Sequence, residues 1–418
     1  MDNNPHSPAP AEGLLFTPVT IGPLTLRNRS IRSAAFEGMC QGNAPTQMLH
    51  DYHVSVAKGG IGMTTLAYAA VTRSGLSFPH QLWMRPEVLP ALRNITDDIH
   101  KAGAKASIQL GHCGNMSKPA MAGCMPVSAS TGFNLYSPTF VRGLRRDELP
   151  PLAHAFGEAV RMARDAGFDA VEIHAGHGYL ISQFLSPYTN HRRDEYGGSL
   201  ENRMRFMNMC IENVLEAAGN DLAVLVKINM HDGFRSGMQT PDCLRVAAEL
   251  ERAGVHALVL SAGFVSRAPM EVMRGAMPIK SMAYYMKQRW LKFFARHFGH
   301  FLIPDCPFSE GYFLEEALRF RQALHLPLVY VGGLVSRSKI EEVLGKGFEA
   351  VQMARALINE PDFINRLRNG EERCGCTHAN YCIARMYSRE MACHEHCTLP
   401  PVLQRELEKM EQKEKKAL

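Results

Sequence analysis

The sequence predicts an α/β protein of the (β/α)8 TIM barrel class, with an N-terminal β-hairpin and a Cys-rich C-terminal extension. Apolar runs and amphipathic helices alternate between residues 30 and 368. Regular strand–helix alternation implies a parallel sheet, and eight such units in a chain of 418 residues favour a closed barrel. An open doubly wound sheet is the competing fold and would carry a glycine fingerprint after its first strand. Residues 30–39 carry none, so we expect the barrel.

Three parts are expected along the chain. Residues 1–13 are polar and proline-rich, without the basic region and apolar core of a secretory signal, which predicts a disordered tail. Residues 14–372 form the barrel, and residues 373–418 a Cys/His-rich segment that ends in a charged helix over 403–416. Within residues 14–28, apolar and turn residues alternate, which predicts a hairpin.

The elements of the barrel follow from apolar runs and helical spacing. The expected strands cover residues 30–36, 61–71, 105–110, 170–174, 223–229, 257–263, 328–334 and 350–356. The expected helices cover 47–58, 87–102, 152–165, 241–253, 314–324, 336–345 and 361–368, and one more contains 200–214 with Ser199 as its cap.

Two longer connections interrupt this alternation. A Pro/Ser/Gly-rich loop is expected at 114–138, and a long insertion at 264–311 holds a stripe of Met and aromatic residues. Such a stripe is typical of helix packing. Because long loops after barrel strands also build active sites, we favour a wall of the substrate pocket.

Composition excludes several classes of function. The formal net charge is only +5 with no long basic block, so neither nucleic-acid nor membrane-surface binding is indicated. No apolar run approaches the length of a membrane span. The 11 cysteines, without an export signal, indicate reduced thiols in a cytoplasmic protein.

The strongest functional pattern lies between residues 169 and 206. His174, His177 and Tyr179 follow the end of a predicted buried strand. A histidine pair alone is more typical of a satisfied core pair or a metal site. The whole stretch, with its segments HAGHGYL, FLSP, NHRRDEYGGS and ENR, resembles the Old Yellow Enzyme family of flavin-dependent ene reductases.

The resemblance implies an FMN-dependent oxidoreductase that takes hydride from NADPH or NADH and reduces the C=C bond of a small α,β-unsaturated substrate. His174 and His177 would bind the electron-withdrawing oxygen, and Tyr179 would deliver the proton. Two alternatives are a flavin-dependent amine dehydrogenase or demethylase and an enzyme like 2,4-dienoyl-CoA reductase with an iron–sulfur cluster. A non-catalytic flavin- or metal-binding regulator is the alternative from another class. Either a monomer or a homo-oligomer fits the sequence.

Several strand ends carry residues suited to a flavin mononucleotide. Glycines after the seventh strand would let the backbone approach a phosphate, and an arginine after the eighth matches its geometry. A lysine inside an apolar strand must find a partner, which is either a core carboxylate or the flavin; we favour the flavin. Together with the resemblance, the expected cofactor residues are Ala34, Ala35, Phe36, Tyr68, Gln109, Lys227, Gly332, Gly333, Ala354 and Arg355.

The chain departs from the family pattern in two places. Glu37 stands where the family carries a hydroxyl or thiol beside the flavin, and a carboxylate there would disfavour the anionic reduced form by like-charge repulsion. Near the C-terminus, the four-cysteine run of the dienoyl-CoA reductases is broken, because Ala379 replaces one cysteine. We therefore expect neither an iron–sulfur cluster nor zinc, although Cys376, Cys382, Cys393 and Cys397 are weak candidates for metal ligands.

Overall fold

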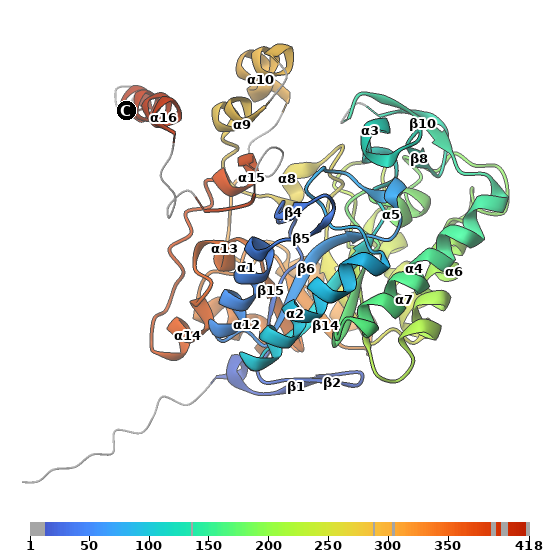
Figure 1. Cartoon of the computed structure of the whole chain (residues 1–418), viewed down its shortest axis with the longest axis horizontal. Helices are drawn as coiled ribbons and strands as arrows, with labels where there is room; N and C mark the ends of the chain where they lie inside the picture. Colours follow the sequence, from blue (N-terminus) through green and yellow to red (C-terminus); the bar gives the residue numbers. More distant parts are fainter. Residues whose placement is uncertain are drawn as a thin grey trace, which may run out of the picture.

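The computed structural model describes residues 13–134, 137–286, 289–302, 306–385, 390–393 and 400–414. Eight parallel strands close into a barrel in the order β11-β12-β13-β14-β15-β3-β6-β7 (Figure 1). They are β3 (Ser30–Arg32), β6 (Met63–Ala70), β7 (Lys105–Gly111), β11 (Ala170–His174), β12 (Ala223–Asn229), β13 (Ala257–Ser261), β14 (Leu328–Val331) and β15 (Ala350–Met353). The predicted fold class is confirmed.

Helices follow the strands around the ring, and all but the one at 355–359, which begins inside the expected strand 350–356, lie close to their predicted positions. They are α1 (Gln47–Lys58), α2 (Leu89–Lys101), α4 (Leu149–Asp165), α6 (Leu200–Ala218), α7 (Thr240–Ala253), α11 (Leu314–Ala323), α12 (Arg337–Gly345), α13 (Arg355–Asn359) and α14 (Phe363–Arg368). The Ser199 hydroxyl caps α6 as predicted, accepting the Asn202 N–H at 3.3 Å. The expected first strand is too long, because the chain turns away after Arg32, whose guanidinium binds the Ala35 carbonyl oxygen.

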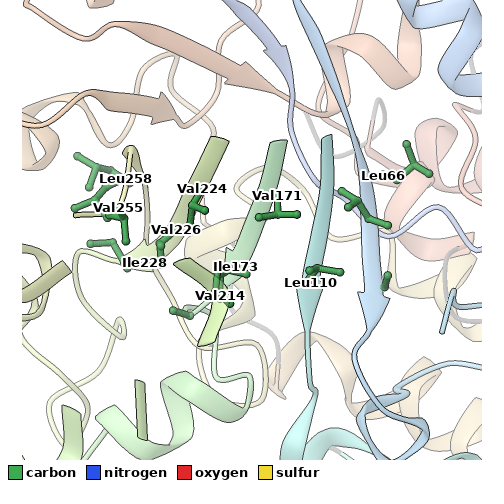
Figure 2. Packing of buried hydrophobic residues seen from close by; sticks show 14 of the residues in the cluster. Leu66, Leu110, Val171, Ile173, Val214, Val224, Val226, Ile228, Val255 and Leu258 are labelled. Atoms are coloured by element: carbon green, nitrogen blue, oxygen red, sulfur yellow. The ribbon is translucent and has the colours of Figure 1, made fainter. Parts of the chain in front are cut away.

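Alternation along the strands separates two layers of side chains. Val171 and Ile173 of β11, with Val224 and Val226 of β12, face outward and pack in the large core beneath the helices (Figure 2). Residues between them face the barrel interior, because successive side chains of a strand point to opposite sides. Every residue of these two strands is buried, as expected for a parallel sheet covered by helices.

The N-terminal hairpin closes one end of the barrel. Its strands are β1 (Val19–Ile21) and β2 (Leu24–Leu26), and their apolar side chains form one cluster with inward-facing residues such as Ala170 and Ala223. The hairpin lies at the foot of the view in Figure 1. This confirms the hairpin and leaves the carboxyl ends of the strands as the end that can admit a ligand.

Two connections between barrel elements form small sheets at that open end. The expected loop 114–138 contains α3 (Pro119–Ala122) and joins a small sheet of β8 (Val127–Ser128), β9 (Gly132–Asn134) and β10 (Thr139–Gly143). Another short hairpin, β4 (Cys40–Gln41) with β5 (Ala44–Pro45), follows β3. The loop is thus more ordered than composition indicated.

The insertion 264–311 holds α8 (Pro269–Val272), α9 (Ile279–Tyr285) and α10 (Arg289–Leu302). In Figure 1, α8 lies close to the barrel, while α9 and α10 extend away from it, as does α16 (Pro401–Glu414). Met270 and Met277 pack with Ile279 in a cluster of their own. These methionines therefore have the packing role that was the alternative expectation. The predicted C-terminal helix corresponds to α16, while residues 1–12 and 415–416 lie outside the described ranges.

None of the helices in the described ranges is both long enough and apolar enough to cross a membrane.

Candidate active site

Three aromatic rings gather just beyond the end of β11. The His174 ring stacks on the Tyr179 ring with centroids 4.1 Å apart, and it meets the His177 ring edge-on at 5.1 Å. His177 and Gly178 both have left-handed backbone, with φ of 57° and 79°. A Cβ on Gly178 would lie 2.5 Å from the Phe264 ring, so only glycine fits this turn. The structure therefore brings together the three residues that the sequence singled out.

Neighbouring strands hold His177 in its strained conformation. Its backbone N–H donates to Asn229 Oδ1 at 2.9 Å, and its Nε2 lies 2.7 Å from the Ser261 hydroxyl. Asn229 is fixed in turn, since its amide donates to Asp232 and to the Gly263 carbonyl oxygen. A left-handed non-glycine residue persists only where its surroundings fix it, and here β12 and β13 do so.

The two imidazoles are neutral at physiological pH. Burial, together with the nearby His177 and the positive charge of Lys227, holds the pKa of His174 well below its usual range. Burial and Lys227 lower the pKa of His177 to about 3. The buried Nδ1 of His174 has no hydrogen-bond partner within the described part of the chain. A buried polar atom without a partner is costly, so this nitrogen is suited to an incoming polar ligand.

Tyr68 forms a second side of the same cluster. Its ring lies edge-on to the Tyr179 ring at 5.0 Å. Its hydroxyl lies 3.1 Å from the Gly75 carbonyl oxygen and 3.0 Å from the Ser77 hydroxyl, which orients the ring. Val265, at the start of the insertion, packs against this group. The insertion therefore does contribute one residue to the apolar group around Tyr68.

A polar layer fills the barrel interior below these rings. Lys227 Nζ lies 2.8 Å from Glu172 Oε1, and Gln109 Nε2 donates to the same oxygen at 2.7 Å. Gln352 Nε2 donates to Glu172 Oε2 at 2.6 Å. Lys227 thus has the core carboxylate partner that was the alternative to a flavin. Because Lys227 lies in the half of the barrel nearer the open end, a contact between Lys227 and the flavin is still predicted.

The expected phosphate cradle lies where β14 and β15 end. Gly333 has φ of 66°, and a Cβ there would lie 2.7 Å from the Tyr312 ring. Arg355 Nη1 donates to the Arg274 carbonyl oxygen at 2.6 Å and to Asn380 Oδ1 at 2.7 Å. The Arg274 guanidinium lies over the Tyr312 ring, 4.7 Å from its centroid. Two arginines therefore lie near a turn that only glycine permits.

Glu37 is turned away from the barrel interior. Its carboxylate pairs with Arg32 Nη1 at 2.8 Å and lies 3.3 Å from the His53 ring on α1. Arg32 faces outward, since its neighbour Ile31 belongs to the interior cluster. Glu37 therefore lies between the barrel wall and α1, and its charge is balanced by an arginine. The preceding Ala34, Ala35 and Phe36 connect it to β3, with the Phe36 ring 4.6 Å from that of Phe78.

The C-terminal cysteines are only partly described. Cys376, Cys382 and Cys393 are partly exposed, while Cys397 lies outside the described ranges. Burial raises the pKa of Cys382 to about 11, which favours the thiol. Among the residues that the structure describes, no group of three or more His, Cys, Asp or Glu could hold a metal ion.

The family model described as NADH:flavin oxidoreductase / NADH oxidase matches residues 14–294. The chain belongs to this family. Within this flavin oxidoreductase family, it is 38% identical to 4,4'-dithiodibutanoate disulfide reductase from Rhodococcus erythropolis, over 90% of this chain and 93% of that protein. It is 28% identical to NADH oxidase from Thermoanaerobacter brockii, but its match spans only 56% of that longer protein. The chain is therefore an NAD(P)H-dependent oxidoreductase, in agreement with the Old Yellow Enzyme resemblance.

The fold agrees with solved members of the family. The structure of the old yellow enzyme homologue from Zymomonas mobilis superposes with a TM-score of 0.70 at 24% identity, covering 90% of this chain and 96% of that one. The glycine cradle, the interior donors and the orphaned His174 nitrogen fit an FMN group at the open end of the barrel. Sequence reasoning missed Glu172, Gln352, Ser261, Asn229 and Arg274, although the alternation of AVEIH could have placed Glu172 inside.

The neutral His174 predicts an acid-sensitive fold. A histidine in the unfolded chain has a pKa of about 6.5. Below that pH the unfolded chain therefore binds a proton at this residue, whereas the folded chain does not. Stability from this residue is therefore complete above pH 6.5 and is lost progressively as the pH falls below that value. His174→Gln should show a shallower fall of the thermal midpoint between pH 7.5 and 5 than the wild type. The exposed His154→Gln is the control, and equal slopes in all three proteins would contradict the assignment.

Proposed function

We propose that this flavin oxidoreductase reduces the C=C bond of activated alkenes, such as enones and nitroalkenes, with NAD(P)H as electron donor and FMN as cofactor. The observation that carries the proposal is the cluster of His174, His177 and Tyr179 at the open end of the barrel. FMN, when bound, supplies the hydride to the alkene. The rest of the reaction falls to side chains of the chain itself.

His174 and His177 bind the carbonyl or nitro oxygen of the substrate in this proposal. Each neutral imidazole has one N–H to donate, and such donors stabilise negative charge as it develops on the oxygen. The burial that keeps them neutral also excludes water, which strengthens these hydrogen bonds. Tyr179, stacked on His174, then delivers the proton to the α-carbon as a general acid.

The FMN contacts divide between the cradle and the interior layer. Gly332, Gly333 and Arg355 hold the phosphate, because glycine lets backbone N–H groups approach and arginine pairs with a phosphate through two parallel bonds. Gln109 and Lys227 meet the pyrimidine end of the flavin ring. Ala34, Ala35, Phe36, Tyr68 and Ala354 complete the proposed contacts at the surrounding strand ends.

Arg355→Ala should weaken binding of FMN but not of riboflavin, which lacks the phosphate. A charge-assisted contact contributes about 1.5–3 kcal/mol, so the FMN dissociation constant should rise about 10- to 100-fold. Titration of the apoprotein with each flavin, followed by fluorescence quenching, measures this. Arg321→Ala removes a guanidinium beside Glu349 on the outer side of the barrel and serves as the control. Equal losses for both flavins would place Arg355 elsewhere.

Tyr179→Phe should slow alkene reduction far more than flavin reduction by the nicotinamide. General-acid catalysis contributes on the order of 10²–10⁴ in rate, and only the alkene half-reaction needs a proton on carbon. Stopped-flow traces of the two half-reactions separate the effects. Nitroalkenes should be affected least, because their nitronate product can leave unprotonated. Equal slowing of both half-reactions, or of neither, would refute the proton-donor role.

Disulfide reduction is the second candidate, because the disulfide reductase of R. erythropolis matches nearly the whole chain. In that reaction, two electrons break the S–S bond, one sulfur takes a hydrogen, and the other leaves as a thiolate that is then protonated. No carbonyl oxygen takes part, so the two imidazoles would lose their proposed role.

Rates of NAD(P)H oxidation with an enone and with 4,4'-dithiodibutanoate distinguish the two candidates. For an ene reductase, His177→Ala should lower kcat/KM for the enone by at least tenfold, since a lost hydrogen bond of about 1.5 kcal/mol corresponds to that factor. The same variant should leave disulfide turnover within about twofold. A wild-type preference for the disulfide of tenfold or more would replace the ene reductase proposal with the second candidate.

A further inference from the structure

Five polar side chains form one hydrogen-bonded network inside the barrel, in which Ser33, Glu172, Lys227 and Gln352 close a ring and Gln109 is joined to it through Glu172. They are Ser33, Gln109, Glu172, Lys227 and Gln352, and each is at most 3% exposed. Ser33 follows β3, and the other four lie on β7, β11, β12 and β15. A buried polar ring of this kind is stable only when its members satisfy one another.

The directions of these hydrogen bonds are fixed by the two charges. An ammonium can only donate and a carboxylate can only accept. Lys227 donates to Glu172 at 2.8 Å and to the Ser33 hydroxyl at 3.3 Å. Ser33 then donates to Gln352 Oε1 at 3.0 Å, and Gln352 Nε2 donates back to Glu172 at 2.6 Å. Each amide and hydroxyl in the ring therefore has one orientation.

Glu172 is the acceptor on which this order depends. Its Oε1 takes Gln109 Nε2 and Lys227 Nζ, while its Oε2 takes Gln352. Because the nitrogen of Gln109 is committed to Glu172, its carbonyl oxygen is left to accept from another group. Glu172 also lies two residues before His174 on the same inward face of β11, about 7 Å below it along the strand.

We propose that Glu172 is a positioning residue that orients Gln109 and Lys227 toward the flavin and balances the lysine charge. This rests on the proposed function, in which FMN lies above the ring. The oriented Gln109 oxygen suits the N3–H donor of the flavin pyrimidine. The carboxylate offsets part of the Lys227 charge, so the anionic reduced flavin is stabilised less than by a free lysine. The bound flavin is kept a stronger reductant in this way.

The midpoint potential of bound FMN tests this directly, because a purely structural ion pair would change stability without changing the potential. Glu172→Gln removes the negative charge at nearly constant shape. The equilibrium constant for reduction of bound FMN should rise tenfold or more. This corresponds to a midpoint potential about 30 mV more positive for a two-electron couple. Glu37→Gln is the matched control, since it removes another buried, ion-paired carboxylate on the outer side of the barrel wall. Its potential should stay near that of the wild type.

Gln352→Met provides the opposite sign and covers the case in which Glu172→Gln does not fold. It removes one hydrogen-bond donor from Glu172, so the negative charge of the carboxylate is less offset by its neighbours. The midpoint potential of bound FMN should therefore become more negative. Equal potentials in wild type, Glu172→Gln and Gln352→Met would overturn the inference while leaving FMN binding intact. A wild type that binds no flavin would instead overturn the proposed function.

Discussion

The buried ion pair between Lys227 and Glu172 constrains which residues can occupy the interior of the barrel and the open end above it. Moving two charges out of water is expensive, and their attraction offsets this only when further hydrogen bonds satisfy both groups. Both side chains are nearly fully buried, and the remaining members of the ring supply those bonds. Polar residues are therefore needed on several strands at once. Stability comes instead from the outward layer, where Val171, Ile173 and their neighbours pack beneath the helices.

This polar layer sets the height at which the functional rings begin. Strand pairing places His174 directly opposite Lys227, because β11 and β12 run in parallel register. Above that level the backbone leaves the sheet through the left-handed turn at His177 and Gly178. The same lysine whose charge is balanced by Glu172 also helps keep both imidazoles neutral. The charge of Lys227 in the polar layer therefore also contributes to the protonation state of the His174 and His177 rings above it.

Most of the barrel could be predicted from the sequence because strand runs such as AVLVKIN and AVEIH carry both length and alternation. Adjacency of His174, His177 and Tyr179 followed from their short spacing after one strand. Partners across strands were harder to predict. The choice between a carboxylate and a flavin for Lys227, or the outward turn of Glu37, depends on register and on side-chain direction. The local sequence pattern specifies neither the strand register nor the direction of these side chains. The role of the insertion could not be predicted for a related reason, since a Met-rich stripe fits a pocket wall and a satellite core equally well.

The same considerations indicate where substrate choice is made. In the proposed function, the ring at Glu172 acts on the flavin, which alkene and disulfide reduction would both use. Besides the two imidazoles, side chains that could tell these substrates apart would come from the rim. Two rim segments reach the apolar cluster that contains Tyr68, because Val265 of the insertion and Met121 of α3 both pack against it, as does Tyr179. Both lie in connections that are long for a barrel of this class. Loops on a fixed scaffold change more readily than the strands that carry them, so the rim is the part of this chain in which specificity can differ from that of its relatives.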